Sequence, residues 1–90
     1  MDTSDYQQGN SIDWNDLVEA VLSDKHVDTF SSIPNENLDF ILEPLNRNFI
    51  VQSILTSLIK TDNPKANATY ANEIVDLMIE IAQRFRKSQA

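Results

Sequence analysis

Apolar residues recur every three or four positions over most of this chain, and this spacing limits the fold more than any other feature. Because an α-helix completes a turn in 3.6 residues, such spacing gathers apolar side chains on one face of a helix. No run alternates apolar and polar residues as a half-buried strand does. We therefore expect an all-α fold, a small bundle of four to five helices. The expected helices cover about residues 11–23, 35–43, 44 or 48–60 and 64–87, with a short helical turn after residue 24.

Capping residues and prolines set the expected boundaries of these helices. Ser11 or Asp13 can cap the first helix, because a short polar side chain accepts hydrogen bonds from the first turn. Asn35 is the expected cap of the third helix, and Pro44 ends it, kinks it or opens the next one. In the segment TDNP, Asn63 is the expected cap of the last helix, with the proline at the first helical position. This short connection predicts that the two C-terminal helices form an antiparallel hairpin.

Length and composition indicate one small domain. Ninety residues, of which 41% are hydrophobic, suffice for a single core. The polar first ten residues predict a disordered acidic leader over 1–10, followed by a single helical domain over 11–90. The chain has no cysteine, no secretory signal and no run of about 18 apolar residues, so we expect a cytoplasmic protein without a membrane span. Its composition is typical of the products of small viral or mobile-element genes, and a viral origin would place it in the host cytoplasm.

The charge is distributed unevenly along the chain. Residues 1–43 hold ten acids and one base, a net charge of −9, and residues 44–90 hold four acids and six bases, a net charge of +2; together they give −7. The acidic half disfavours nucleic acid or an anionic membrane as a partner. It is either a solvated surface or the docking face of an acidic inhibitor that mimics nucleic acid, with candidates Asp13, Asp16, Asp24 and Asp28. A third hypothesis is an oligomeric nucleic-acid assembly factor whose C-terminal end contacts phosphate through Arg84, Arg86 and Lys87.

No pattern of catalytic or metal-binding residues is recognisable. His26 is the only histidine and there is one glycine, so neither a hydrolytic triad nor a phosphate-binding glycine loop is indicated. Glu73, Asp76 and Glu80 share a helix face, but the chain lacks the Glu-x-x-His motif of di-iron bundles. We expect a protein that is not an enzyme and that has no cofactor and no metal.

The surfaces of the last two expected helices suggest a protein partner. Their apolar faces are wider than one neighbour covers, and a 24-residue helix, about 36 Å long, would overhang a domain roughly 30 Å across. Within VQSILTSLIK the polar side is uncharged until Lys60, which suits close approach of another helix. We therefore expect this helix to be central, with its second side covered by another chain or by the first helix.

These observations favour a non-enzymatic protein–protein interaction module, a homodimeric helical adaptor or regulator. Its expected partners are a second copy, another protein, or both. The candidate interface combines phenylalanines on the polar sides of their helices with the uncharged polar positions and with apolar positions of the last helix: Phe40, Phe49, Gln52, Thr56, Leu77 and Ile79.

Overall fold

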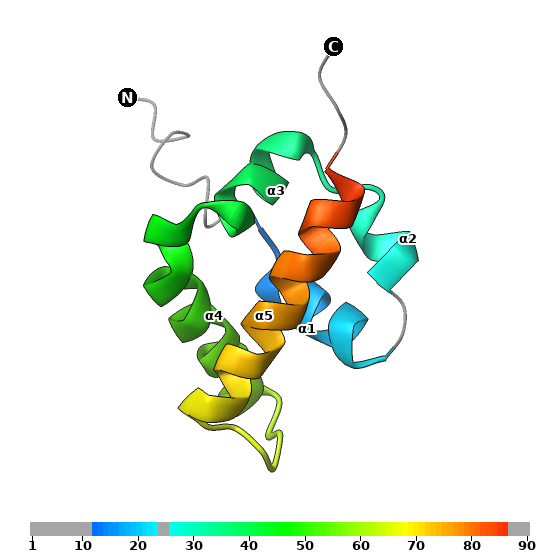
Figure 1. The fold of residues 1–90 in the computed structure, drawn as a ribbon. Helices are drawn as coiled ribbons and strands as arrows, with labels where there is room; N and C mark the ends of the chain where they lie inside the picture. Colours follow the sequence, from blue (N-terminus) through cyan, green and yellow to red (C-terminus); the bar gives the residue numbers. More distant parts are fainter. Residues whose placement is uncertain (1–11, 24–25, 87–90) are drawn as a thin grey trace, which may run out of the picture.

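The computed structural model describes residues 12–23 and 26–86, and within them the chain forms five α-helices and no strand (Figure 1). The all-α fold is therefore confirmed. The predicted leader, Asp24 and Lys87 lie outside the described residues. The elements are α1 (Trp14–Leu22), α2 (His26–Phe30), α3 (Asn35–Leu42), the 3-10 turn η2 (Pro44–Asn46), α4 (Arg47–Lys60) and α5 (Ala68–Phe85).

Local hydrogen bonds explain where α1 and α3 begin. Asp13 caps α1, and its Oδ1 accepts a hydrogen bond from the backbone N–H of Asp16 at 3.1 Å. One of the two predicted caps is thus confirmed. The prediction for α3 is wrong by one position, because Pro34 occupies the cap and Asn35 is the first helical residue. Proline at the cap position adopts its usual extended conformation there, so α3 begins without a side-chain cap.

The start of α5 differs more from the sequence-based prediction. Asn67, not Asn63, is its cap, and Asn67 Oδ1 accepts a hydrogen bond from the N–H of Tyr70 at 2.8 Å. Asn63 instead accepts from the N–H of Lys65 at 2.8 Å, which makes a turn in the connecting loop. Asp62 reverses the chain just before it with a positive φ of 56°. The sequence contains two asparagines with suitable spacing, and the second one starts the helix.

The shorter α5 removes one argument for a partner. It has 18 residues and is about 27 Å long, which fits within the 42 Å longest dimension of the molecule. The expected overhang of a 24-residue helix is therefore wrong. Any case for association has to come from the surface of the folded domain.

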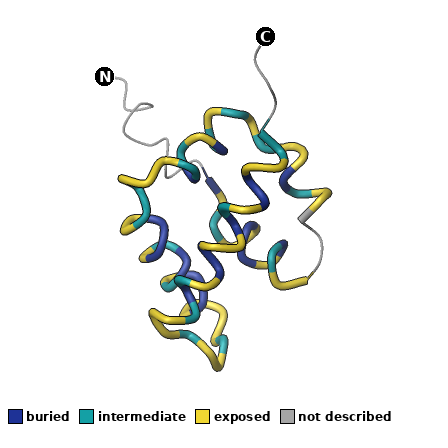
Figure 2. Tube along the Cα trace, in the orientation of Figure 1, coloured by how far each residue is buried: buried dark blue, intermediate teal, exposed yellow. Residues whose placement is uncertain are grey.

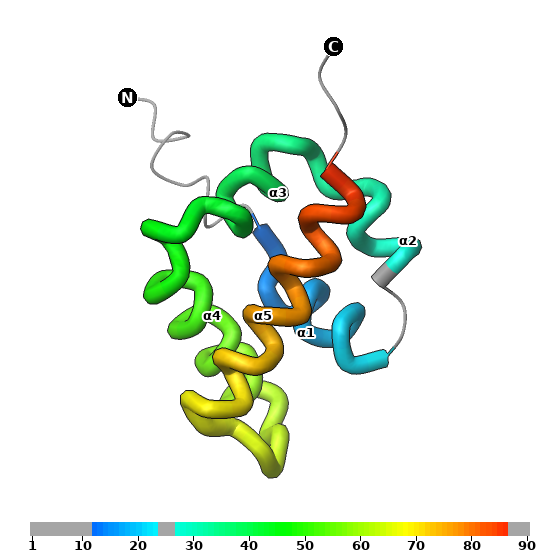
Figure 3. The backbone as a smooth tube through the Cα atoms, viewed as in Figure 1, coloured from blue at the N-terminus to red at the C-terminus, as the bar shows by residue number. Residues whose placement is uncertain are grey.

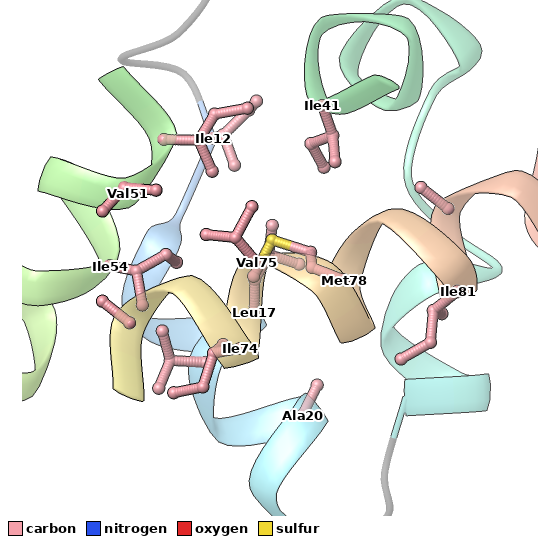
Figure 4. Packing of buried hydrophobic residues seen from close by; sticks show 14 of the residues in the cluster. Ile12, Leu17, Ala20, Ile41, Val51, Ile54, Ile74, Val75, Met78 and Ile81 are labelled. Carbon is pink, nitrogen blue, oxygen red and sulfur yellow. The ribbon is translucent and has the colours of Figure 1, made fainter. Parts of the chain in front are cut away.

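The central helix is α5, and the expectation that α4 would be central is wrong. Helices α1, α2, α3 and α4 all pack against α5, which carries buried residues along its length (Figure 2). Figure 4 shows Val75 and Met78 of α5 among side chains of the surrounding helices, including Leu17 of α1, Ile41 of α3 and Ile54 of α4. Because α5 presents apolar residues over a wide face, it can contact several neighbours at once.

Helix α4 packs against α5 and leaves its other side towards α1 and solvent. The two helices meet at the 61–67 loop at one end of the molecule (Figure 3). Near the start of α4, Arg47 reaches across, donating to Asn72 Oδ1 at 3.0 Å and pairing with Asp76 at 2.9 Å. No helix in the described ranges has the length and apolar character that crossing a membrane requires.

Candidate functional site

Three aromatic rings from three helices meet on one side of the domain. Trp14 at the start of α1, Phe40 of α3 and Phe49 of α4 contact one another, with ring centroids 5.7–6.5 Å apart. Two of the three pairs are edge-to-face, a geometry that adds about 0.5–1.5 kcal/mol per pair beyond the area buried. Phe40 is half-buried within this aromatic cluster, whereas Phe49 remains 44% exposed.

An open groove extends from the aromatic cluster along the seam between α1 and α4. Its volume is about 600 Å³, and Trp14 and Phe49 are part of its lining. The α4 wall includes the uncharged polar residues that the sequence singled out, together with Phe49 and Lys60. Asp13 and Lys60 are the charged residues of the lining. The complete lining is Ile12, Asp13, Trp14, Asn15, Phe49, Gln52, Ser53, Thr56, Ser57 and Lys60.

A partly buried hydrogen bond joins the two helices that line this groove. Ser57 is only 3% exposed, and its hydroxyl donates to Asn15 Oδ1 of α1. On the other side of this bond a second hollow of about 350 Å³ lies against Val18 and Leu22. Helix α1 therefore covers the polar side of α4 at Ser57, as one of the two sequence-based alternatives expected. Gln52 and Thr56 stay exposed.

The outward side of α4 and of the turn before it carries unusual apolar exposure. Leu45 is 89% exposed and Ile59 is 59% exposed, and Phe49 lies between them in sequence. Helix α4 contains no acidic residue, although the protein as a whole is strongly acidic. Each of the other α-helices carries at least one acid: Asp16 and Glu19 in α1, Asp28 in α2, Glu36 and Asp39 in α3, and Glu73, Asp76 and Glu80 in α5.

The structure places four of the six predicted interface residues in the aromatic cluster or the groove. Phe40 and Phe49 belong to the aromatic cluster, and Gln52 and Thr56 line the groove. Leu77, 49% exposed, and Ile79, partly buried against the core, lie on α5 and do not line the groove.

Three of the four predicted acidic docking residues lie in the described part of the chain, and all three are exposed. Asp13 and Asp16 flank the first turn of α1, and Asp28 lies on α2. The carboxylate of Asp13 is used as the helix cap. Asp13 lines the groove between α1 and α4, whereas Asp16 and Asp28 do not, and the acidic-inhibitor hypothesis stays a prediction.

One of the three predicted phosphate contacts, Arg86, is already engaged in an ion pair. Arg84 is exposed in the last turn of α5, whereas Arg86 pairs with Asp39 of α3 through two hydrogen bonds, one of them 3.1 Å from Nη2 to Oδ2. The hydrogen bond from Arg86 lowers the pKa of Asp39, and the same bond raises the pKa of Arg86. Because Arg86 already has an anionic partner, a phosphate would have to displace Asp39.

No cluster of metal-ligating side chains is present among residues 12–23 and 26–86. Comparison with known proteins adds no assignment, since no family model, curated protein or solved structure matches this chain at a significant level. The groove and the exposed side of α4 are thus the features from which function has to be argued.

The sequence-based prediction missed five members of this surface: Ile12, Trp14, Asn15, Leu45 and Ile59. Trp14 has the spacing of a core residue in α1, so only the position of α1 against α4 reveals its part in the groove. A signal for Leu45 and Ile59 was present, because both continue the four-and-three spacing of Phe49, Gln52 and Thr56.

Proposed function

We propose that this protein is a non-enzymatic protein-interaction module, a small helical adaptor or regulator. Its binding surface is the groove between α1 and α4 together with the outward side of α4. The observation that carries the proposal is Phe49, which is 44% exposed yet held by edge-to-face contacts with Trp14 and Phe40. A ring fixed in this way loses little conformational entropy on binding, which favours it as an interface anchor.

The chemistry around Phe49 supports the same proposal. Protein interfaces place aromatic anchors at their centre and few charges beside them. Here the aromatic cluster adjoins uncharged Gln52, Ser53 and Thr56, whose amide and hydroxyl groups are able to hydrogen-bond a partner and cost less to desolvate than charges. The two charged lining residues, Asp13 and Lys60, have opposite signs.

We also propose that α4 and α5 act as one antiparallel hairpin that supports this surface. The support is their mutual packing, the short loop that joins them, and Arg47, which ties α4 to Asn72 and Asp76 of α5. A rigid scaffold under a binding surface reduces the entropic cost of association. The absence of cysteine supports a cytoplasmic setting for this module.

Site-specific photocrosslinking tests the proposed function. A photoreactive phenylalanine analogue is placed at Phe49, with a second position at Thr56 and a matched control at Leu77. Leu77 is exposed to a similar extent, 49% against 44%, but does not line the groove. In the cells that make the protein, crosslinks to a discrete polypeptide are expected from positions 49 and 56 and not from 77. No product from 49 and 56, or equal products from all three, would contradict the proposal.

A further inference from the structure

We propose that a second copy of this chain covers the outward side of α4, with the two α4 helices packed antiparallel about a twofold axis at Gln52. This inference rests on the proposed function and names the partner of the same surface. It is carried by three features of the described residues: a self-complementary row of side chains, the charge of α4, and the positions of two exposed ionic residues.

The row consists of Leu45, Phe49, Gln52, Thr56 and Ile59, which follow one another at intervals of four, three, four and three residues. This is the spacing of the seam between two packed helices, because it keeps Phe49, Gln52, Thr56 and Ile59 on one narrow stripe of α4. Leu45 extends the row from η2, the turn that leads into α4. All five residues are exposed in the single chain. The stripe has apolar residues at both ends and polar residues in the middle, and one additional helix is enough to cover it.

The row matches itself when it is reversed. Position 52 is the midpoint between 45 and 59, so a twofold axis there places Leu45 opposite Ile59 of the second copy, and the reverse. Phe49 then lies next to Thr56 of the second copy. The two Gln52 carboxamides meet on the axis, where each has both a donor and an acceptor for the other. A polar pair at one seam position is a known way of fixing helix register.

Charge favours the same arrangement. Two copies with a net charge of −7 each repel one another. Among the described α-helices, α4 is the one without an acidic residue, so a contact through α4 brings no helix carboxylates of the two copies together. Reversal about position 52 places Lys60 opposite position 44, next to Glu43 of the second copy. Both residues are exposed, so two symmetrical Glu43–Lys60 pairs form at the ends of the contact. A parallel arrangement would place Lys60 against Lys60 instead.

The size of this contact predicts a weak dimer. Helix α4 is about 21 Å long, so the buried area falls at the low end of specific interfaces. We expect a dissociation constant on the order of 10–100 μM. Such a dimer is concentration-dependent, and it competes with any other protein that uses Phe49.

A charge-exchange experiment tests the antiparallel register directly. The purified full chain is studied by sedimentation equilibrium in low salt as wild type, Lys60→Glu, Glu43→Lys and a mixture of these two variants. In each single variant both end pairs become repulsive, and dimerisation is expected to weaken about 5- to 30-fold. In the mixture every pair is again Glu with Lys, so a heterodimer within about threefold of wild-type affinity is expected.

A matched control separates local from overall charge. Lys65→Glu changes the net charge as Lys60→Glu does, but Lys65 is exposed in the 61–67 loop outside the row. Its dimerisation is expected to stay within about twofold of wild type. Far-UV circular dichroism of each variant shows whether the fold is retained, which matters for Glu43 because its carboxylate accepts a hydrogen bond from the N–H of Leu45 at 3.3 Å.

Two results would overturn the proposal. One is a wild-type protein that remains monomeric at about 500 μM, well above the expected dissociation constant. The other is a dimer in which Lys60→Glu behaves as Lys65→Glu does, or in which mixing restores nothing. If either occurs while positions 49 and 56 still crosslink to a different polypeptide, the interaction module stands and only the second copy is refuted. If those crosslinks are also missing, both proposals fail.

Discussion

The aromatic cluster makes an energetic prediction that the geometry allows us to estimate. Phe40 and Phe49 approach edge-to-face with centroids 5.7 Å apart at an interplanar angle of 84°. Truncating a fully buried phenylalanine to alanine costs about 3–5 kcal/mol, and both rings here are only partly buried, so each single substitution is expected to cost about 2 kcal/mol. The ring–ring contact itself contributes about 1 kcal/mol. The double variant should therefore lose about 3 kcal/mol, not the sum of about 4 kcal/mol.

Urea unfolding followed by far-UV circular dichroism measures these free energies. Tryptophan fluorescence is unsuitable as the only probe, because Trp14 contacts both rings and its signal changes with either substitution. Measurements at a few micromolar protein keep any weak dimer dissociated. The quantity of interest is the coupling free energy of the four-variant cycle: wild type, Phe40→Ala, Phe49→Ala and the double variant.

Ile59 provides a control for the cycle. It lies on α4 as Phe49 does and is 59% exposed. It follows Phe49 by ten residues, which is about 15 Å along the axis of α4. Ile59→Ala combined with Phe40→Ala is expected to be additive within about 0.5 kcal/mol. If the Phe40–Phe49 coupling is also within about 0.3 kcal/mol of zero, the rings do not support one another and Phe49 is not a pre-fixed anchor.

Three further predictions concern contacts that hold the helices together. The hydrogen bond from Arg86 lowers the pKa of Asp39 from its ordinary value of 3.8. The ion pair therefore stabilises the fold above pH 3.8, and this contribution is lost as the pH falls from there through the lower pKa of the folded state. The difference in urea midpoint between wild type and Asp39→Asn should shrink between pH 6 and pH 3. Ser57→Ala removes the donor to Asn15 and should lower the free energy of unfolding by about 1 kcal/mol in urea titrations; no change would mean that this bond does not hold α1 on α4. Asn67→Ala should cost about 1 kcal/mol and accelerate amide hydrogen exchange in the first turn of α5, whereas an unchanged exchange rate would show that the cap lies elsewhere.

Much of the local structure follows from sequence patterns alone. The all-α fold is confirmed because the apolar spacing of this chain suits helices and no segment alternates as a strand does. Asp13 was identifiable as a cap of α1 because its short carboxylate is placed just before the apolar stripe. The start of α5 was not identifiable, since Asn63 and Asn67 both fit the local rule and the loop geometry around Asp62 decides between them.

Part of the candidate site was also predictable. Phe49, Gln52 and Thr56 stand out because they lie on the polar side of an apolar helix without charge, which is a property of one segment. Leu77 was a candidate for a different reason, because the apolar face of the last helix is wider than one neighbour covers. It lies outside the groove because α5 is central and exposes its remaining side elsewhere. The apolar width of a helix indicates how many neighbours it needs, but it does not say which helix occupies the centre.

The sequence by itself determined the fold class, most helix positions and the acid-free character of α4, because these depend on spacing and composition within single segments. Only the tertiary structure decided that Trp14, Phe40 and Phe49 form one aromatic cluster and that Ser57 is buried against Asn15 while Gln52 and Thr56 remain exposed. The physical reason is that these contacts join residues 9 to 42 positions apart, and their formation depends on how whole helices pack around α5.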